Sequence, residues 1–138
     1  MLSPQRVLVV GDDELQARET ALVLRGAGYD VIHAGSCAAA RRLKVAFEIG
    51  LFDVELADGD GVELAGSLLA EGHVRRVVFR SALEAAATLR DARRLGPVLP
   101  AECANTELLD MVVHSCPPRS QIPPPPASLA VSKRFAAG

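Results

Sequence analysis

The chain has 138 residues, a length that fits one domain with a tail. Hydrophobic residues make up 49% of it but aromatic residues only 4%, so we expect an aliphatic core. A formal net charge of -2 and the scarcity of aromatic rings argue against direct nucleic-acid binding, which needs positive charge and stacking faces. No apolar stretch is long enough to cross a bilayer and no signal peptide is recognisable, so we expect a cytoplasmic protein without membrane contact.

Short apolar segments alternate with segments of helical periodicity along the chain. The apolar residues of the helical segments recur three or four positions apart, whereas strand segments such as 7–10 are continuously apolar. In chain order, the expected elements are a strand at 6–10, a helix at 13–27, a strand at 30–34, a helix from a Ser36 cap to about Phe47, a strand at 49–52, a turn at 58–61, a helix at 62–70, a strand at 77–79, a helix at 83–95, a short strand at 98–99 and a last helix capped by Asn105 or Thr106.

Five strands that alternate with five helices predict an α/β domain with a parallel sheet covered on both faces. Right-handed crossovers make this a three-layer, doubly wound five-stranded sheet. Ligands of such domains bind at the carboxyl ends of the strands, where the strand order reverses. We therefore expect the functional site at that edge of the sheet.

The composition changes after Cys116. Six of the nine prolines lie in the remaining segment, including the run at 123–126. Consecutive prolines form neither helix nor central strand. We therefore expect one domain at 1–116 and a disordered, proline-rich tail at 117–138 that is dispensable for folding.

Polar side chains stand at the ends of the first, third and fourth predicted strands. Asp12 and Asp13 follow the first, Asp53 follows the third, and Ser81 follows the fourth. Each alone has an ordinary explanation as a helix cap or surface acid. Carboxylates that converge on one edge repel each other, and Mg²⁺ with oxygen ligands relieves this repulsion. A carboxylate beside Mg²⁺ can attack a phosphoryl group, and Ser81 can donate a hydrogen bond to it.

Three segments resemble response-regulator receiver domains: 7–13 (VLVVGDD), 28–31 (GYDV) and 51–61 (LFDVELADGDG). The resemblance covers residues 6 to about 115. The last segment is the most specific, because members of the family commonly read D-x-x-L-P-D-G-D-G there. The resemblance implies a flavodoxin-like receiver fold and a place in two-component phosphorelay signalling. The phosphoryl group would come from a histidine kinase or a histidine phosphotransfer protein.

The resemblance also implies roles for individual residues. Asp53 is the phosphoacceptor. The Mg²⁺ ligands are Asp12, Asp53 and the backbone carbonyl of Glu55, with Asp13 as a further candidate. Ser81 is the switch hydroxyl that contacts the phosphoryl group, next to the small Ala82.

Three positions depart from the pattern of the family, and one of them is Ala57, which replaces the common proline. Gly11 stands where the first acid of a pair is expected, and Leu99 stands in place of a lysine before Pro100. The lysine pairs with phosphoryl oxygens, which a hydrocarbon side chain cannot do. Leu99 is instead expected to pack as an apolar plug over the carboxyl edge. The pattern thus indicates a divergent receiver whose phosphorylation is weak or absent.

The expected output is a contact with a downstream protein. The chain is then a signalling module and not an enzyme, beyond self-phosphorylation and dephosphorylation at Asp53. One alternative is a pseudo-receiver that binds a partner without phosphorylation. A remote alternative is a phosphatase of the haloacid-dehalogenase type, but that family requires D-x-D, and here the segment reads Asp53, Val54, Glu55.

Overall fold

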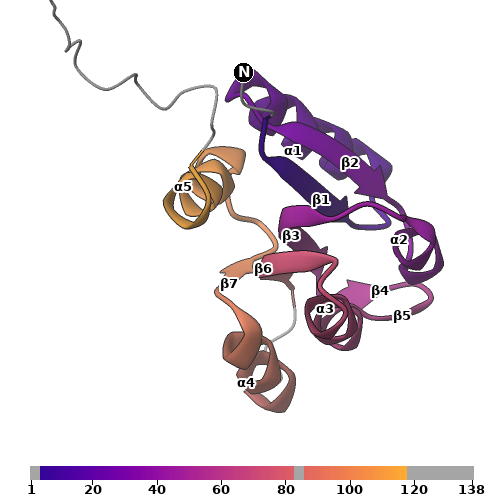
Figure 1. The fold of residues 1–138 in the computed structure, drawn as a ribbon. Helices are drawn as coiled ribbons and strands as arrows, with labels where there is room; N and C mark the ends of the chain where they lie inside the picture. The colour runs from indigo at the N-terminus through magenta and orange to yellow at the C-terminus, as the bar shows by residue number, and fades with distance from the viewer. Residues whose placement is uncertain (1–3, 83–85, 118–138) are drawn as a thin grey trace, which may run out of the picture.

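A computed structural model describes residues 4–82 and 86–117 and shows one five-stranded parallel sheet (Figure 1). The strand order is β2-β1-β3-β6-β7. The strands are β1 (Arg6–Val10), β2 (Asp30–Ala34), β3 (Phe47–Asp53), β6 (Val74–Ser81) and β7 (Val98–Pro100). A separate antiparallel pair joins β4 (Glu55–Leu56) to β5 (Gly59–Asp60).

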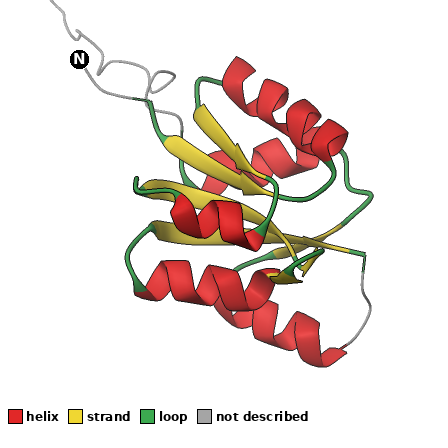
Figure 2. Ribbon diagram, turned by 90° about the vertical axis from the view of Figure 1, so that its right-hand side faces the viewer, coloured by secondary structure: helices red, strands yellow, loops and turns green. Residues whose placement is uncertain are grey.

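Five helices cover the two faces of the sheet (Figure 2). They are α1 (Glu14–Gly26), α2 (Cys37–Arg42), α3 (Gly61–Ala70), α4 (Ala86–Leu95) and α5 (Asn105–Ser115). Val7 and Val9 of β1 belong to the apolar cluster under α1 and α5. Leu8 and Val10 belong to the cluster under α2, α3 and α4, because successive side chains of a strand point to opposite faces. The predicted three-layer, doubly wound α/β fold is confirmed.

The strand order reverses between β1 and β3. The chain runs from β1 outward to β2 and then returns to place β3 on the other side of β1. The carboxyl ends of β1 and β3 therefore flank the position where ligands bind in sheets of this type. Asp53 is the last residue of β3, so the topology places it at this position.

The predicted helix from Ser36 to about Phe47 was too long. Ser36 caps α2 as expected, because its Oγ accepts a hydrogen bond from the amide of Ala39 at 3.0 Å. The helix ends at Arg42, and Phe47 already pairs with Val74 as the first residue of β3. The buried ring of Phe47 and its pairing in the sheet decide where this helix ends.

Three further boundaries differ from the prediction. The turn predicted at 58–61 is instead the β4–β5 hairpin followed by Gly61, which already starts α3. Strand β6 is longer than 77–79, since it extends over Val74–Ser81. The N-cap of α5 is Ala104, not Asn105 or Thr106, and Asn105 is the first residue of the helix.

Parts of two predictions lie outside the described residues. They are the first turn of the helix expected at 83–95 and the tail expected at 117–138, of which only Pro117 is described. Among the helices at 4–82 and 86–117, none has the length and apolar character needed to cross a membrane.

Candidate functional site

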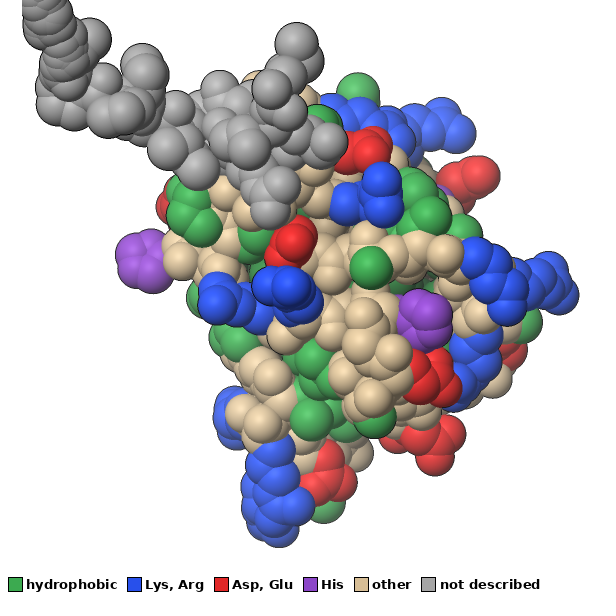
Figure 3. Space-filling view, viewed as in Figure 1, with side chains coloured by type: hydrophobic (Ala, Val, Ile, Leu, Met, Phe, Trp, Pro, Cys, Tyr) green, Lys and Arg blue, Asp and Glu red, His purple; other side chains and the backbone are tan. Residues whose placement is uncertain are grey.

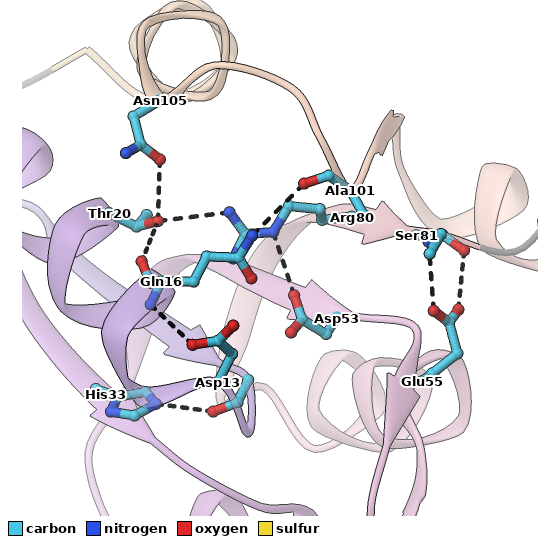
Figure 4. A network of polar contacts seen from close by, with 12 residues as sticks. Asp13, Gln16, Thr20, His33, Asp53, Glu55, Arg80, Ser81, Ala101 and Asn105 are labelled. Atoms are coloured by element: carbon cyan, nitrogen blue, oxygen red, sulfur yellow. Dashed lines mark hydrogen bonds and ion pairs between the residues drawn. The ribbon is translucent and has the colours of Figure 1, made fainter.

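Asp53 lies at the carboxyl edge of the sheet and forms an ion pair with Arg80 of the neighbouring strand (Figure 4). The two residues are direct partners in the parallel register of β3 and β6, so their side chains point to the same face. The Nε of Arg80 lies 3.3 Å from Oδ1 of Asp53. The side chains are only 7% and 17% exposed, respectively, which makes this a largely buried pair.

Arg80 is held from a second side by Thr20 of α1. Its Nη1 donates to Oγ1 of Thr20 at 3.4 Å. The Thr20 hydroxyl has one proton, and two acceptors lie within its reach, the carbonyl oxygen of Gln16 at 2.9 Å and Oδ1 of Asn105 at 3.2 Å. A short polar network thus connects Asp53 to helix α1 and to the first residue of α5 (Figure 4).

Arg80 is a residue of this edge for which no role was predicted. The sequence could have indicated that Arg80 is buried, because strand alternation places it on the same face as the buried Val78. A charged residue at the buried end of a strand needs a partner of opposite charge. The partner itself, Asp53, follows only from the register of the two strands.

Burial raises the pKa of the Asp53 carboxyl group above its ordinary value. The adjacent Arg80 guanidinium opposes this shift by its charge and its hydrogen bond, and it is the second largest influence. The negative charges of Asp12 and Glu55 raise the pKa of Asp53 further. The structure therefore places three carboxylates within electrostatic reach at this edge, with Arg80 as the opposing charge.

Asp12 and Asp13 have different environments. The Oδ2 of Asp12 accepts a hydrogen bond from the amide of Ala57 at 2.9 Å, which ties the end of β1 to the β4–β5 hairpin. Asp13 is the N-cap of α1, and its Oδ1 accepts from the amide of Gln16 at 3.1 Å. Asp13 therefore has the ordinary role of an acid that opens a helix.

Gly11 leaves room that the side chain of Asp53 occupies. A β-carbon at position 11 would lie 2.7 Å from Oδ2 of Asp53, closer than a van der Waals contact. The carboxylate of Asp53 and a side chain at position 11 thus exclude each other in this arrangement. The glycine that replaces the family's acid at position 11 therefore makes room for the carboxylate of Asp53.

Glu55 binds the two donors at the end of β6. The Oγ of Ser81 donates to Oε2 of Glu55 at 2.9 Å, and the amide of Ala82 donates to Oε1 at 3.3 Å (Figure 4). A phosphoryl group also presents several acceptor oxygens, so a hydroxyl and an amide in this position suit it equally well. The side chain of Glu55 thus occupies the Ser81 hydroxyl, which is the predicted donor to the phosphoryl group, and the neighbouring amide of Ala82.

The side chains at this edge are not arranged as a metal centre. Among the described residues, no three His, Cys, Asp or Glu side chains are placed to hold one ion. One oxygen of Asp12 is engaged by a backbone amide, and Oδ1 of Asp53 is engaged by Arg80. Both side-chain oxygens of Glu55, whose backbone carbonyl is the predicted ligand, are engaged by donors of β6 and the residue after it. In this arrangement the residues do not fit Mg²⁺, and the Mg²⁺ site at Asp12, Asp53 and the Glu55 carbonyl stays a prediction.

Leu99 lies on β7 directly opposite Arg80 in the register of β6 and β7. Its side chain is half-buried and packs against the apolar cluster under α1 and α5. It also lines an open pocket together with Ser81, Ala82 and Pro100. The positive charge that the family places at position 99 is absent, but another cation stands on the neighbouring strand.

No protein-family model and no curated protein sequence matches this chain. Solved structures do match it. The N-terminal domain of a response regulator/sensory box/GGDEF three-domain protein from Carboxydothermus hydrogenoformans is 27% identical, with a TM-score of 0.68, over 80% of this chain and 93% of that one. The receiver domain of the Francisella response regulator 1452 is 22% identical, with a TM-score of 0.72, over 80% and 95% of the two chains.

The chain has the receiver fold of response regulators. The resemblance predicted from the three sequence segments is thereby confirmed. A third structure with this receiver fold is the response regulator TrrA from Thermotoga maritima, in complex with Mg²⁺ and BeF. It is 18% identical, with a TM-score of 0.71, over 80% of this chain and 98% of that one.

Proposed function

We propose that this receiver domain is a signalling module of a two-component phosphorelay in which Asp53 accepts a phosphoryl group. One observation carries the proposal. The Asp53 carboxylate ends β3 at the reversal of strand order, with the cation of Arg80 beside it. The hydroxyl of Ser81 and the amide of Ala82 follow at the end of the adjoining strand.

The transfer is a nucleophilic displacement at phosphorus. An oxygen of the ionised Asp53 carboxylate attacks the phosphorus atom of a phosphohistidine. The phosphorus–nitrogen bond breaks, its electron pair stays on the imidazole ring, and an aspartyl phosphate forms. Arg80 favours the ionised carboxylate and offsets the added negative charge. Ser81 and Ala82 bind phosphoryl oxygens once the Glu55 side chain has moved away.

The donor in this proposal is a histidine kinase or a histidine phosphotransfer protein, and the output is a contact with a downstream protein in the cytoplasm. Leu15 and Leu22 support a protein partner, because these α1 side chains lie two turns apart and are 65% and 62% exposed. Direct nucleic-acid or membrane binding is not part of the proposal. On the face shown in Figure 3, basic side chains are interspersed with acidic ones and form no continuous basic surface.

Incubation with a small phosphodonor such as acetyl phosphate should add one phosphoryl group to the wild-type protein. The variant Asp53→Asn should gain none, because an amide oxygen is a poor nucleophile. Intact mass spectrometry measures both. Asp13→Asn is the matched control, since Asp13 caps α1 and should not affect labelling. Labelling of Asp53→Asn would instead point to another acceptor, with Asp12 and Asp13, which follow the first strand, as the first candidates.

A second candidate function is that of a pseudo-receiver that binds its partner without phosphorylation. Glu55 already occupies the Ser81 and Ala82 donors, and Arg80 already pairs with Asp53. These contacts stabilise the unphosphorylated site. A wild-type protein that stays unlabelled at high phosphodonor concentration would favour this function.

Replacing Leu99 with lysine should speed the labelling of Asp53 or enlarge the NMR shift changes that accompany it. A second cation near Asp53 adds a partner for phosphoryl oxygens. The free energy of unfolding should fall by about 1–3 kcal/mol, because Leu99 is half-buried and Arg80, a like charge, stands opposite. Leu99→Met is the control for side-chain shape. Equal labelling rates and equal shifts in all three proteins would show that Leu99 does not limit the reaction.

A further inference from the structure

The acidic edge requires a positive charge. Asp12 and Glu55 both act electrostatically on Asp53. Carboxylates that share one site destabilise each other's ionised forms unless a cation is present. The sequence alone left Mg²⁺ as the candidate for that cation.

The structure contains a cation of its own at this position. Arg80 is the buried cross-strand partner of Asp53, and Thr20 holds its second nitrogen. An arginine side chain stays protonated at every physiological pH, so this charge is permanently present. Asp53 and Thr20 hold the guanidinium of Arg80 in place, because a buried guanidinium loses its hydration and only these partners replace it.

The same geometry disfavours a divalent ion. Mg²⁺ requires oxygen ligands at about 2.0–2.1 Å in nearly octahedral geometry. On Asp53 it would have to bind beside a guanidinium 3.3 Å from the same carboxylate. The Oδ2 of Asp53 lies against Gly11, where no acid is present to act as a further ligand, and Oδ2 of Asp12 is held by the amide of Ala57.

We propose that Arg80 is the resident cation of this site and takes the place of a divalent ion, so that Asp53 accepts a phosphoryl group without Mg²⁺. The inference rests on the proposed function for its reaction, but the presence of the resident cation can be tested without phosphorylation. The transfer step is the one written above, with phosphohistidine or acetyl phosphate as the only co-reactant. The guanidinium suits the product, because its planar set of donors binds carboxylate and phosphoryl oxygens alike.

The first test is a Mg²⁺ titration of the full chain, followed by amide NMR shifts and by the thermal unfolding midpoint. Wild type should show no saturable shifts around Asp12, Asp53 and Glu55, and the same midpoint in EDTA and in Mg²⁺. Arg80→Gln removes the charge but keeps a hydrogen-bond donor, and it should show saturable Mg²⁺ shifts at concentrations where wild type shows none. Arg80→Lys keeps the charge and should behave as wild type.

Saturable Mg²⁺ binding by wild type with a raised midpoint would overturn the proposal, and so would an Arg80→Gln variant that binds no better than wild type. If Arg80→Gln does not fold, the wild-type midpoints still decide the question. The second test is acetyl phosphate labelling in EDTA and in Mg²⁺, with rates expected to agree within about twofold. Labelling that requires Mg²⁺ would overturn the proposal. Absence of labelling in both conditions would refute the phosphoacceptor function, while the titration would still report on Arg80.

Discussion

Replacing Arg80 with methionine should lower the free energy of unfolding by about 3 kcal/mol, because it breaks a buried ion pair. This value is at the low end of the range for such pairs, since the side chain of Asp53 is still 17% exposed. Methionine fills similar space but leaves the Asp53 carboxylate without its cation and Thr20 without its donor. Chemical denaturation followed by circular dichroism measures the effect.

The loss should depend on pH. It should shrink as the pH falls, because a protonated carboxyl group needs no cation. Burial raises the pKa of Asp53, so the difference between the two proteins should begin to shrink at a higher pH than for an exposed aspartate, whose pKa is about 4. Unfolding curves for both proteins across the acidic range measure this.

Arg75→Met is the matched control for Arg80→Met. Arg75 lies on the same strand and forms an ion pair with Glu48 at 3.7 Å, but its side chain is 78% exposed. Exposed pairs contribute at most about 1 kcal/mol. Equal losses in the two variants would mean that Arg80 and Asp53 are not a buried pair in solution. The double replacement Arg80→Met with Asp53→Leu should recover much of the loss, because it leaves no unpaired charge.

Replacing Gly61 with alanine should cost about 3 kcal/mol, near the upper end of the usual range for overpacking. A β-carbon at the start of α3 would lie 1.9 Å from the carbonyl oxygen of Asp53. This oxygen belongs to the backbone and cannot rotate away. Relief therefore requires α3 or the end of β3 to move, and the amide of Gly61 would lose its 2.8 Å hydrogen bond to Val54. Phosphodonor labelling of Asp53 should slow as well.

Gly26→Ala is the control for Gly61→Ala. Gly26 is the last residue of α1, and a β-carbon there meets no atom within 4 Å. This replacement should leave stability unchanged or raise it by at most about 1 kcal/mol, since alanine favours helix more than glycine does. A Gly61→Ala variant as stable as Gly26→Ala would contradict the close approach of α3 to Asp53.

The sequence by itself determined the architecture and the location of the candidate site. The strands predicted at 6–10 and 30–34 match β1 and β2 residue for residue. Residues 7–10 of the central strand β1 are buried on both faces of the sheet, so local hydrophobicity suffices to locate this strand, whereas the edge strand β2 buries only Val31 and Ala34. The carboxyl ends of parallel strands lie at one edge of the sheet, so the polar residues that follow the strands meet there. Asp53 lies at this edge, where the strand order reverses.

Only the tertiary structure decided the length of α2. The segment after Arg42 has the apolar content of a helix face, yet β3 starts at Phe47, which pairs with Val74. Competition between local helix formation and pairing with a distant strand cannot be resolved from neighbouring residues. The burial of the Phe47 ring and the hydrogen bonds of the sheet favour the strand.

The tertiary structure also decided which groups surround Asp53. Arg80 is 27 residues away along the chain and becomes its partner through the register of β3 and β6. Glu55 reaches Ser81 and Ala82 because Asp53, two residues before it, pairs with Arg80 in the register of β3 and β6. The sequence identified an acidic edge and its need for a cation, since like charges repel wherever they meet. The identity of that cation depends on which strands are neighbours and in what register, and these are properties of the folded chain.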